Sequence, residues 1–132
     1  MYPYQNITHK IIAAAIEVHK NLGPGLLEVV YLVCLSVELE LYGLRFQKEL
    51  NIPLSYKNRR IDHSFRIDFL VENEVILELK SIEAILPVHK AQLLTYLKLT
   101  GKQVGLLINF NVALLKNGIH RCILSEAKVT PG

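Results

Sequence analysis

Hydrophobic and polar residues alternate in two short runs near the middle of the chain, at residues 65–71 and 75–79. The apolar members all occupy odd positions: Phe65, Ile67, Phe69, Val71, Val75, Leu77 and Leu79. A period of two predicts β-strands with these side chains on one buried face. Only residues 72–74 separate the runs, so we expect a hairpin in which Val71 pairs with Val75.

The other face of this hairpin carries Arg66, Asp68, Glu78 and Lys80. Continuing the register brings Asp68 opposite Glu78, and two carboxylates this close repel each other. A divalent cation offsets that repulsion, because Mg²⁺ is a hard ion that takes carboxylate oxygens together with water and substrate phosphate. Lys80 would add positive charge at the edge of such a site. The alternative from these residues alone is an exposed ion pair, which contributes little stability.

Two helical patterns precede the hairpin. Apolar residues recur at helical spacing over roughly residues 7–21, and a Gly-Pro-Gly sequence then ends the pattern. Residues 27–42 predict a second helix, with Gly43 at the position of a left-handed cap. Residues 44–50 and 52–56 predict strands, the second of them an edge strand or a bulged one because of Pro53.

A strand–helix–strand unit follows. Residues 88–100 show helical spacing up to Gly101, and residues 104–110 form a nearly continuous apolar run, typical of a central strand covered on both faces. Residues 121–124 predict a last short strand. A chain of 132 residues, 51% of them hydrophobic, fits one compact domain. We therefore expect residues 1–132 to form a single α/β domain with a mixed central sheet flanked by helices.

Composition narrows the classes of function. The longest apolar stretches fall short of the roughly 20 residues that cross a bilayer, and the first residues lack a signal-peptide pattern, so we expect a cytoplasmic protein without a membrane partner. Cys34 and Cys122 show neither disulfide nor zinc spacing. The net charge of +3 is compatible with a polyanionic partner. Arg59 and Arg60 belong to the densest basic run, which is either a solvated turn or a phosphate contact.

The spacing of the charged residues resembles a known superfamily. Asp68, nine intervening residues and then Glu78-Leu79-Lys80 resemble the PD-(D/E)XK phosphodiesterase motif. Gln92, twelve residues after Lys80, matches the glutamine often found on the following helix. The upstream residues Gly25, Glu28 and Tyr31 form a Gly-x-x-Glu-x-x-Tyr sequence, which resembles the signature of the GxxExxY family of PD-(D/E)XK-like proteins. Residues 18–20 and 86–97 are also similar to that family, so the resemblance covers nearly the whole chain.

This resemblance implies a restriction-endonuclease-like fold and a metal-dependent site. Glu28, Asp68 and Glu78 would hold Mg²⁺ or Mn²⁺, and Lys80 would position the attacking water or stabilise charge on the phosphorane. Metal-assisted hydrolysis of a phosphodiester in DNA or RNA is the implied chemistry. Taken without the resemblance, Glu28 is explained by the helix dipole alone.

We expect the residues that contact the substrate to come from the third helix and the basic run. Gln92 would orient Lys80 or contact the phosphate, and His89 and Tyr96 would contact the substrate, as would Arg59 and Arg60. The alternative is that the three side chains of the third helix form only a polar rim.

Three functions remain open from the sequence. The first is a metal-dependent nuclease. The second is a non-catalytic nucleic-acid- or protein-binding module that retains the nuclease fold. The third is a domain that acts only as part of a dimer, such as a homodimer, in which a partner subunit or another protein completes the substrate groove. A chain this short offers little surface to a duplex, because specific interfaces bury on the order of 1,000–2,500 Å² of protein surface.

Overall fold

The computed structural model describes residues 4–124. In chain order the elements are α1 (Gln5–Leu22), α2 (Glu28–Leu41), β1 (Phe46–Tyr56), β2 (Arg59–Val71), β3 (Val75–Lys80), α3 (Pro87–Thr100), β4 (Val104–Asn109), the 3₁₀ turn η1 (Leu115–Gly118) and β5 (Ile119–Ile123). The three helices confirm the helical patterns of the sequence. Within these residues no helix is both long and apolar enough to cross a membrane.

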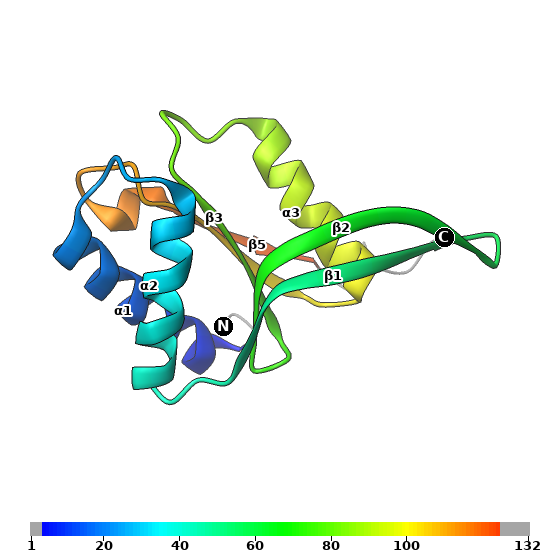
Figure 1. The fold of residues 1–132 in the computed structure, drawn as a ribbon, viewed down its shortest axis with the longest axis horizontal. Coiled ribbons are helices and arrows are strands. Elements are labelled where there is room, and N and C mark those ends of the chain that lie inside the picture. Colours follow the sequence, from blue (N-terminus) through cyan, green and yellow to red (C-terminus); the bar gives the residue numbers. More distant parts are fainter. Residues whose placement is uncertain (1–3, 125–132) are drawn as a thin grey trace.

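One five-stranded sheet forms the middle layer, with its strands in the order β1-β2-β3-β4-β5. β3 and β4 pair in parallel, and the other neighbours pair antiparallel. Because parallel neighbours need a crossover, α3 runs between them, and this confirms the expected strand–helix–strand unit. Helices α1 and α2 cover one face of the sheet and α3 lies on the other (Figure 1). The expected mixed sheet flanked by helices is therefore correct.

Two hydrophobic cores fill the space between these layers. Phe69, Val71, Val75, Leu77 and Leu79 lie in the core under α1 and α2, as the alternation predicts. The prediction is wrong for Phe65 and Ile67, which pack in the core under α3.

The reason for this exception is a change of neighbour along β2. From Phe69 onward β2 pairs with both β1 and β3, whereas before it β2 pairs with β1 alone. A two-stranded ribbon twists more strongly than a wide sheet. Odd-numbered side chains of β2 therefore face α1 and α2 from Phe69 onward, but face α3 before it. Glu49 marks the same place in β1, because its φ of 52° lies in the left-handed region.

The hairpin also differs from the expectation on its second face. Leu70 and Ile76 are buried under α3, and Glu78 is only 6% exposed. An exposed ion pair on a solvent-facing hairpin therefore does not describe Glu78.

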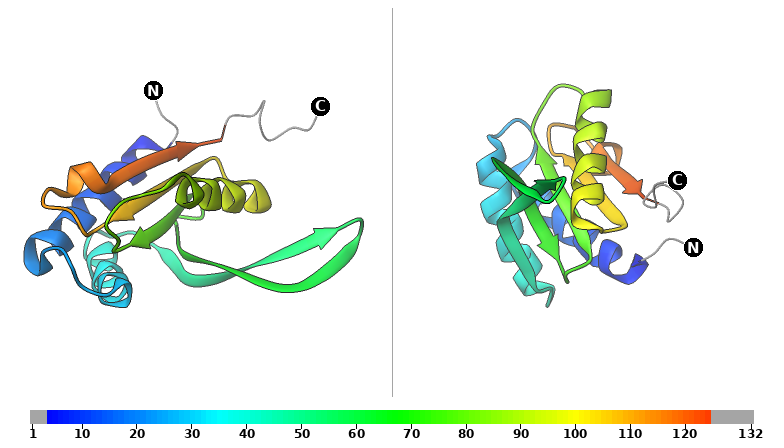
Figure 2. Two further views of the ribbon diagram at one scale, coloured as in Figure 1. Left: turned by 90° about the horizontal axis from the view of Figure 1, so that it is seen from above. Right: turned by 90° about the vertical axis from the view of Figure 1, so that its right-hand side faces the viewer.

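β1 and β2 form a longer ribbon than the sequence predicts. The two strands expected at residues 44–50 and 52–56 are one strand, with a register shift between Ile52 and Leu54. The sheet order places β1 at the edge, so the predicted edge strand is confirmed. Pro53 lies inside the register shift, but the extra residues of the shift, 62–64, belong to β2. The strand returns through Lys57 and Asn58, whose φ angles of 51° and 62° suit a tight hairpin turn. Residues 50–67 are called the arm below. The base of the arm packs under α3, and its outer part with the turn extends beyond the helices and the rest of the sheet (Figure 2).

A close approach between β4 and η1 gives the first prediction. A Cβ on Gly118 would collide with the backbone carbonyl oxygen of Asn109, whereas a Cβ on Gly105 would lie 2.7 Å from the flexible end of Leu93. Overpacking typically costs about 1–3 kcal/mol. Gly118→Ala should lower the free energy of unfolding toward the upper end of that range and Gly105→Ala by less, measured by urea denaturation. Equal losses, or the reverse order, would contradict this packing.

Candidate metal centre and active site

Asp68 and Glu78 meet where β2 turns away from β3. The regular pairing of these strands ends at Phe69 and Leu77. Beyond it, the backbone N–H of Asp68 donates to Oε1 of Glu78 at 3.1 Å, and the backbone N–H of Leu79 donates to Oδ2 of Asp68 at 2.7 Å. Each carboxylate therefore takes the place of a missing ladder acceptor. The prediction that the two acids are cross-strand neighbours is confirmed.

Burial and mutual repulsion raise the pKa of both acids. The pKa of Glu78 is raised to about 8, first by burial and then by the charge of Asp68, while the Asp68 N–H and Lys80 act in the opposite direction. Burial is also the main cause that raises the pKa of Asp68, and the N–H of Leu79 and the charge of Lys80 oppose it. Glu28 and Glu49 add smaller repulsions to Asp68. A cation between the two carboxylates would relieve this penalty.

The loop before α2 explains the Gly-x-x-Glu-x-x-Tyr sequence in structural terms. The ring of Tyr31 is fully buried and stacks on Phe110, with centroids 4.4 Å apart. Its hydroxyl donates to the carbonyl of Gly23 at 2.6 Å and accepts the N–H of Leu26 at 3.1 Å. Tyr31 thus holds the loop that leads into Glu28.

Glu28 itself is the first residue of α2 and is exposed. Its charge raises the pKa of both Asp68 and Glu78, so it lies within electrostatic range of the pair. Gly25, at a φ of 88°, lets the loop adopt a conformation that L side chains rarely take.

Two further residues, which the sequence analysis missed, hold the segment after Lys80. The hydroxyl of Ser81 donates to the carbonyl of Leu26, which ties this segment to the loop before α2. The side chain of Asn109 is 2% exposed, accepts the N–H of Ile82 at 3.1 Å and donates to its carbonyl at 2.9 Å. The one signal was a polar residue inside the apolar run 104–110. A cavity of about 440 Å³ opens here, lined by Gly25, Leu26, Leu27, Glu28, Ser81 and Asn111.

Helix α3 places its polar side chains at different distances from the acidic pair. Tyr96 is 6% exposed, and its pKa is raised by burial and further by the charges of Glu78 and Asp68, so it lies near the pair. Gln92 donates to the Tyr96 hydroxyl at 3.0 Å. His89 instead caps α3, since its Nδ1 accepts the N–H of residue 86 at 2.9 Å. The ring therefore carries its proton on Nε2.

Arg59 and Arg60 lie far from this centre. They begin β2 at the tip of the arm, eight or nine residues before Asp68, which corresponds to roughly 26–30 Å along the strand. Their proposed contact with substrate would therefore be remote from the reacting bond.

The donor set fits a hard divalent cation only in part. Among residues 4–124, no three Asp, Glu, His or Cys side chains are grouped closely enough to hold a metal ion. The expected set of Glu28, Asp68 and Glu78 is thus not assembled as a three-ligand group, and that assignment stays a prediction. Mg²⁺, however, is often bound by one or two carboxylates, with water and substrate phosphate as the other ligands. Asp68 and Glu78 can supply these two carboxylates.

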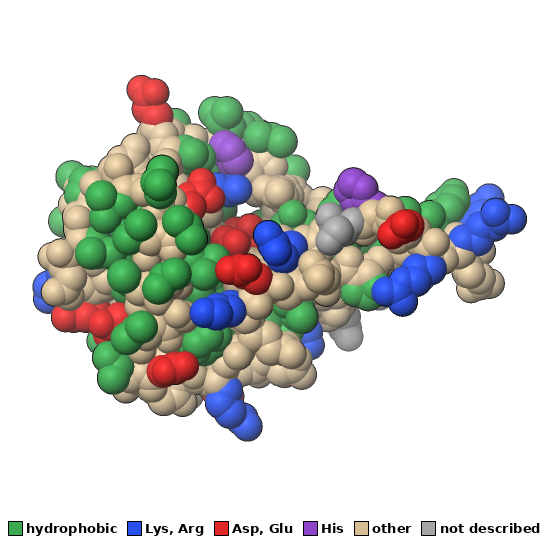
Figure 3. Space-filling view, in the orientation of Figure 1, with side chains coloured by type: hydrophobic (Ala, Val, Ile, Leu, Met, Phe, Trp, Pro, Cys, Tyr) green, Lys and Arg blue, Asp and Glu red, His purple; other side chains and the backbone are tan. Residues whose placement is uncertain are grey.

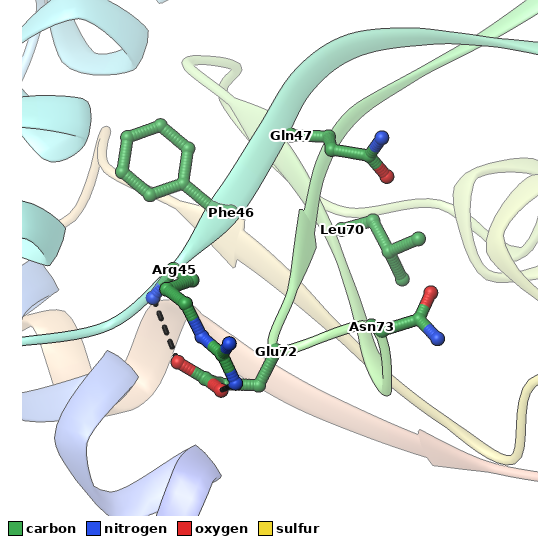
Figure 4. A pocket seen from close by; sticks show the side chains of 6 residues that line it. All are labelled: Arg45, Phe46, Gln47, Leu70, Glu72 and Asn73. Atoms are coloured by element: carbon green, nitrogen blue, oxygen red, sulfur yellow. Dashed lines mark hydrogen bonds and ion pairs between the residues drawn. The ribbon is translucent and has the colours of Figure 1, made fainter.

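The surface around the pair is charged and recessed. Figure 3 shows acidic and basic side chains gathered between the helical layer and the start of the arm. Another hollow lies at the opposite, turn end of β2 and β3, where Arg45 and Glu72 form an ion pair at 3.1 Å (Figure 4). Four residues of strand, roughly 13 Å, separate Glu72 from Asp68. That hollow is therefore not part of the candidate centre.

The raised pKa of Glu78 predicts how stability depends on pH. The folded protein keeps this proton up to about pH 8, whereas an unfolded glutamate loses it near pH 4.5, so unfolding releases a proton between these values. With a chelator present, the contribution of Glu78 to the free energy of unfolding should fall as pH rises from 5 to 8. His120, whose pKa is lowered by burial, acts in the opposite direction.

Glu78→Gln separates the two effects, because His120 is common to both proteins. Urea denaturation at several pH values should show that the free energy of the variant, relative to wild type, rises steadily between pH 5 and 8. A difference that does not change with pH would contradict the buried, proton-retaining Glu78.

Comparison with known proteins agrees with this geometry. A family model described as the PD-(D/E)XK nuclease superfamily matches residues 5–122. No curated protein matches the chain. Among solved structures, one titled "Crystal structure of SSO0001" superposes with a TM-score of 0.55 at 18% identity, covering 96% of this chain and 63% of that one. At this identity the likeness concerns the fold alone. Because the family model spans most of the sequence, the chain belongs to the PD-(D/E)XK nuclease superfamily.

Proposed function

We propose that the protein hydrolyses phosphodiester bonds in nucleic acid, with Mg²⁺ or Mn²⁺ bound at Asp68 and Glu78. The observation that carries this proposal is the cross-strand pair of the buried Glu78 and the half-buried Asp68, whose pKa values are both raised. Buried like charges cost free energy unless a cation offsets them. Membership of a nuclease superfamily supports the same chemistry.

The residues around the pair have distinct roles in this proposal. A bound divalent ion would lower the pKa of a water molecule and polarise the phosphoryl oxygen. Lys80, whose charge reaches both carboxylates, would stabilise the negative charge that develops on the phosphoryl oxygens. Glu28 would supply a third carboxylate from the start of α2. The Gln92 amide, fixed by the Tyr96 hydroxyl, would orient the substrate phosphate.

Within the superfamily we place the chain in the GxxExxY group. Gly25, Glu28 and Tyr31 support this placement because they form one unit, in which Tyr31 fixes the loop and Gly25 permits its turn. The contacts of this loop thus explain the spacing of Gly25 and Tyr31 around Glu28.

A non-catalytic binding module is the second candidate. It is favoured by the absence of a three-ligand group among the described residues and by the engagement of both carboxylates with backbone N–H groups. The two candidates differ in whether Mg²⁺ or Mn²⁺ produces cleavage.

Lys80→Ala tests the catalytic proposal. Loss of a charge that acts mainly in the transition state should lower cleavage by on the order of 10²–10³-fold, while affinity for the nucleic acid changes little. Lys98→Ala, an exposed lysine near the end of α3, is the matched control and should cleave like wild type. The assay uses DNA and RNA substrates, single-stranded, duplex and branched, with Mg²⁺, Mn²⁺ or chelator. Salt-sensitive binding without metal-dependent cleavage of any substrate would favour the binding module.

We also propose that two copies of the chain pair through α2. This helix is apolar on its outward side, where Val29, Val33, Val37 and Leu41 recur every four residues and are 58%, 51%, 53% and 73% exposed. Figure 3 shows hydrophobic side chains gathered over this helix. The four positions are spaced symmetrically about Leu35. In an antiparallel pair of α2 helices, Val33 of one copy would therefore face Val37 of the other, and the two stripes would match along their length. α2 contains no basic residue, which argues against nucleic acid as the occupant.

Charge placed in this stripe tests the pairing. Val33→Lys combined with Val37→Lys should convert a dimer into a monomer, because buried lysines would lack a partner. Leu114→Lys, which changes an equally exposed residue elsewhere, is the control and should leave the mass unchanged. Light scattering during size-exclusion chromatography gives the mass directly. A monomeric wild type would refute the pairing without touching the proposed chemistry.

A further inference from the structure

The excess positive charge of the chain is concentrated in the arm, residues 50–67. This segment contains four of the 15 Lys and Arg residues and one of the 12 Asp and Glu residues, which leaves eleven of each sign in the rest of the chain. The arm therefore has a net charge of +3, equal to that of the whole protein. The remaining domain is neutral overall.

Only the base of the arm is supported by the domain. Ile52 and Ile67 pack in the core under α3, whereas further out Leu54 is only half-buried and Tyr56 is 64% exposed. The turn lies about five residues beyond Ile52, so roughly 16 Å of ribbon is free of the body. The left view of Figure 2 shows this ribbon projecting away from the helices.

The tip of the arm is a cluster of cations next to an aromatic ring. Lys57, Arg59 and Arg60 are exposed, and none of them forms an ion pair in the described part of the chain. The Lys57 ammonium lies 5.6 Å from the centre of the Tyr56 ring. Three exposed cations within four residues favour a polyanionic partner.

Basic residues also occur nearer the acidic pair. Arg66 is exposed and lies in β2 two residues before Asp68. Arg66 contacts Glu49 at 3.9 Å, and the charge of Glu49 also raises the pKa of Asp68. In Figure 3 basic side chains occur at the tip, along the arm and beside the recess near its base.

We propose that the arm is a duplex-binding ribbon whose tip enters the major groove of DNA. This inference rests on the proposed function, because it assigns the substrate of the same site. The major groove of B-form DNA is about 12 Å wide and 8.5 Å deep and admits a two-stranded ribbon, so a free length of roughly 16 Å reaches its floor. The major groove of duplex RNA is too narrow for such an element.

Binding in the presence of chelator tests the arm independently of catalysis. The variant combines Lys57→Ala, Arg59→Ala and Arg60→Ala. Its matched control removes three exposed lysines of the body, through Lys20→Ala, Lys98→Ala and Lys116→Ala. Fluorescence anisotropy compares a 30-base-pair DNA duplex, an RNA duplex and a single strand of the same sequence over a range of salt concentrations. The melting temperature of each variant verifies that it is folded.

The arm variant should bind the DNA duplex at least tenfold more weakly than wild type, and its salt slope should fall by about 2–3, because each lost phosphate contact contributes about 0.9. The body variant should stay within about twofold of wild type. Equal losses in both variants, or wild-type affinity in the arm variant, would overturn the inference. Wild type that binds RNA duplex or single strands as tightly as duplex DNA would refute insertion into the groove.

These outcomes separate the arm from the catalytic proposal. Arm-dependent binding of DNA without metal-dependent cleavage would support the proposed role of the arm and contradict the proposed nuclease activity. Cleavage by a protein whose DNA affinity does not depend on the arm would do the reverse.

Discussion

The reciprocal hydrogen bonding of Asp68 and Glu78 is the constraint on which the site depends. At the point where β2 leaves β3, each carboxylate accepts a backbone N–H that has lost its partner strand. This arrangement holds Glu78 buried and Asp68 half-buried, and burial in turn raises the pKa of both. Two acids held together at such a cost call for a cation, which is the physical basis of the proposed chemistry. Strand β3 also carries Lys80, two residues after Glu78.

The rest of the fold brings other groups to this point. Helix α3 buries the side of the hairpin that carries Glu78 and brings Tyr96 close to the pair. Tyr31 holds the loop that carries Glu28, and Asn109 holds the segment after Lys80. The hydrogen bonds of these two buried side chains go to backbone groups, so Tyr31 and Asn109 determine where the flanking backbone lies. The loop and the segment are joined directly by one hydrogen bond from Ser81.

The pattern of hydrophobic and polar residues predicted those features of the fold that depend on residues close together in the sequence. Alternation around a three-residue turn was enough to give the register of β2 and β3, and hence the meeting of Asp68 and Glu78. The same argument failed for Ile67, because the layer that a strand face contacts depends on how many neighbours the strand has and how far it twists. The length of the arm was also missed, because residues 59–64 contain a single apolar residue and so show no alternation that would predict a strand. The role of Asn109 depends on a contact with a segment 27 residues away and left almost no trace in the sequence.

Direct measurement of cation binding tests the central claim most closely. Titration of the wild type with Mn²⁺, followed by electron paramagnetic resonance at pH 8, should show saturable binding that Mg²⁺ displaces. Asp68→Asn should weaken this binding strongly, whereas Glu72→Gln, which alters an acid at the other end of the same hairpin, should leave it unchanged. Absence of saturable Mn²⁺ binding by the wild type, or equal binding by the Asp68→Asn variant, would contradict the assignment of this pair as a metal site.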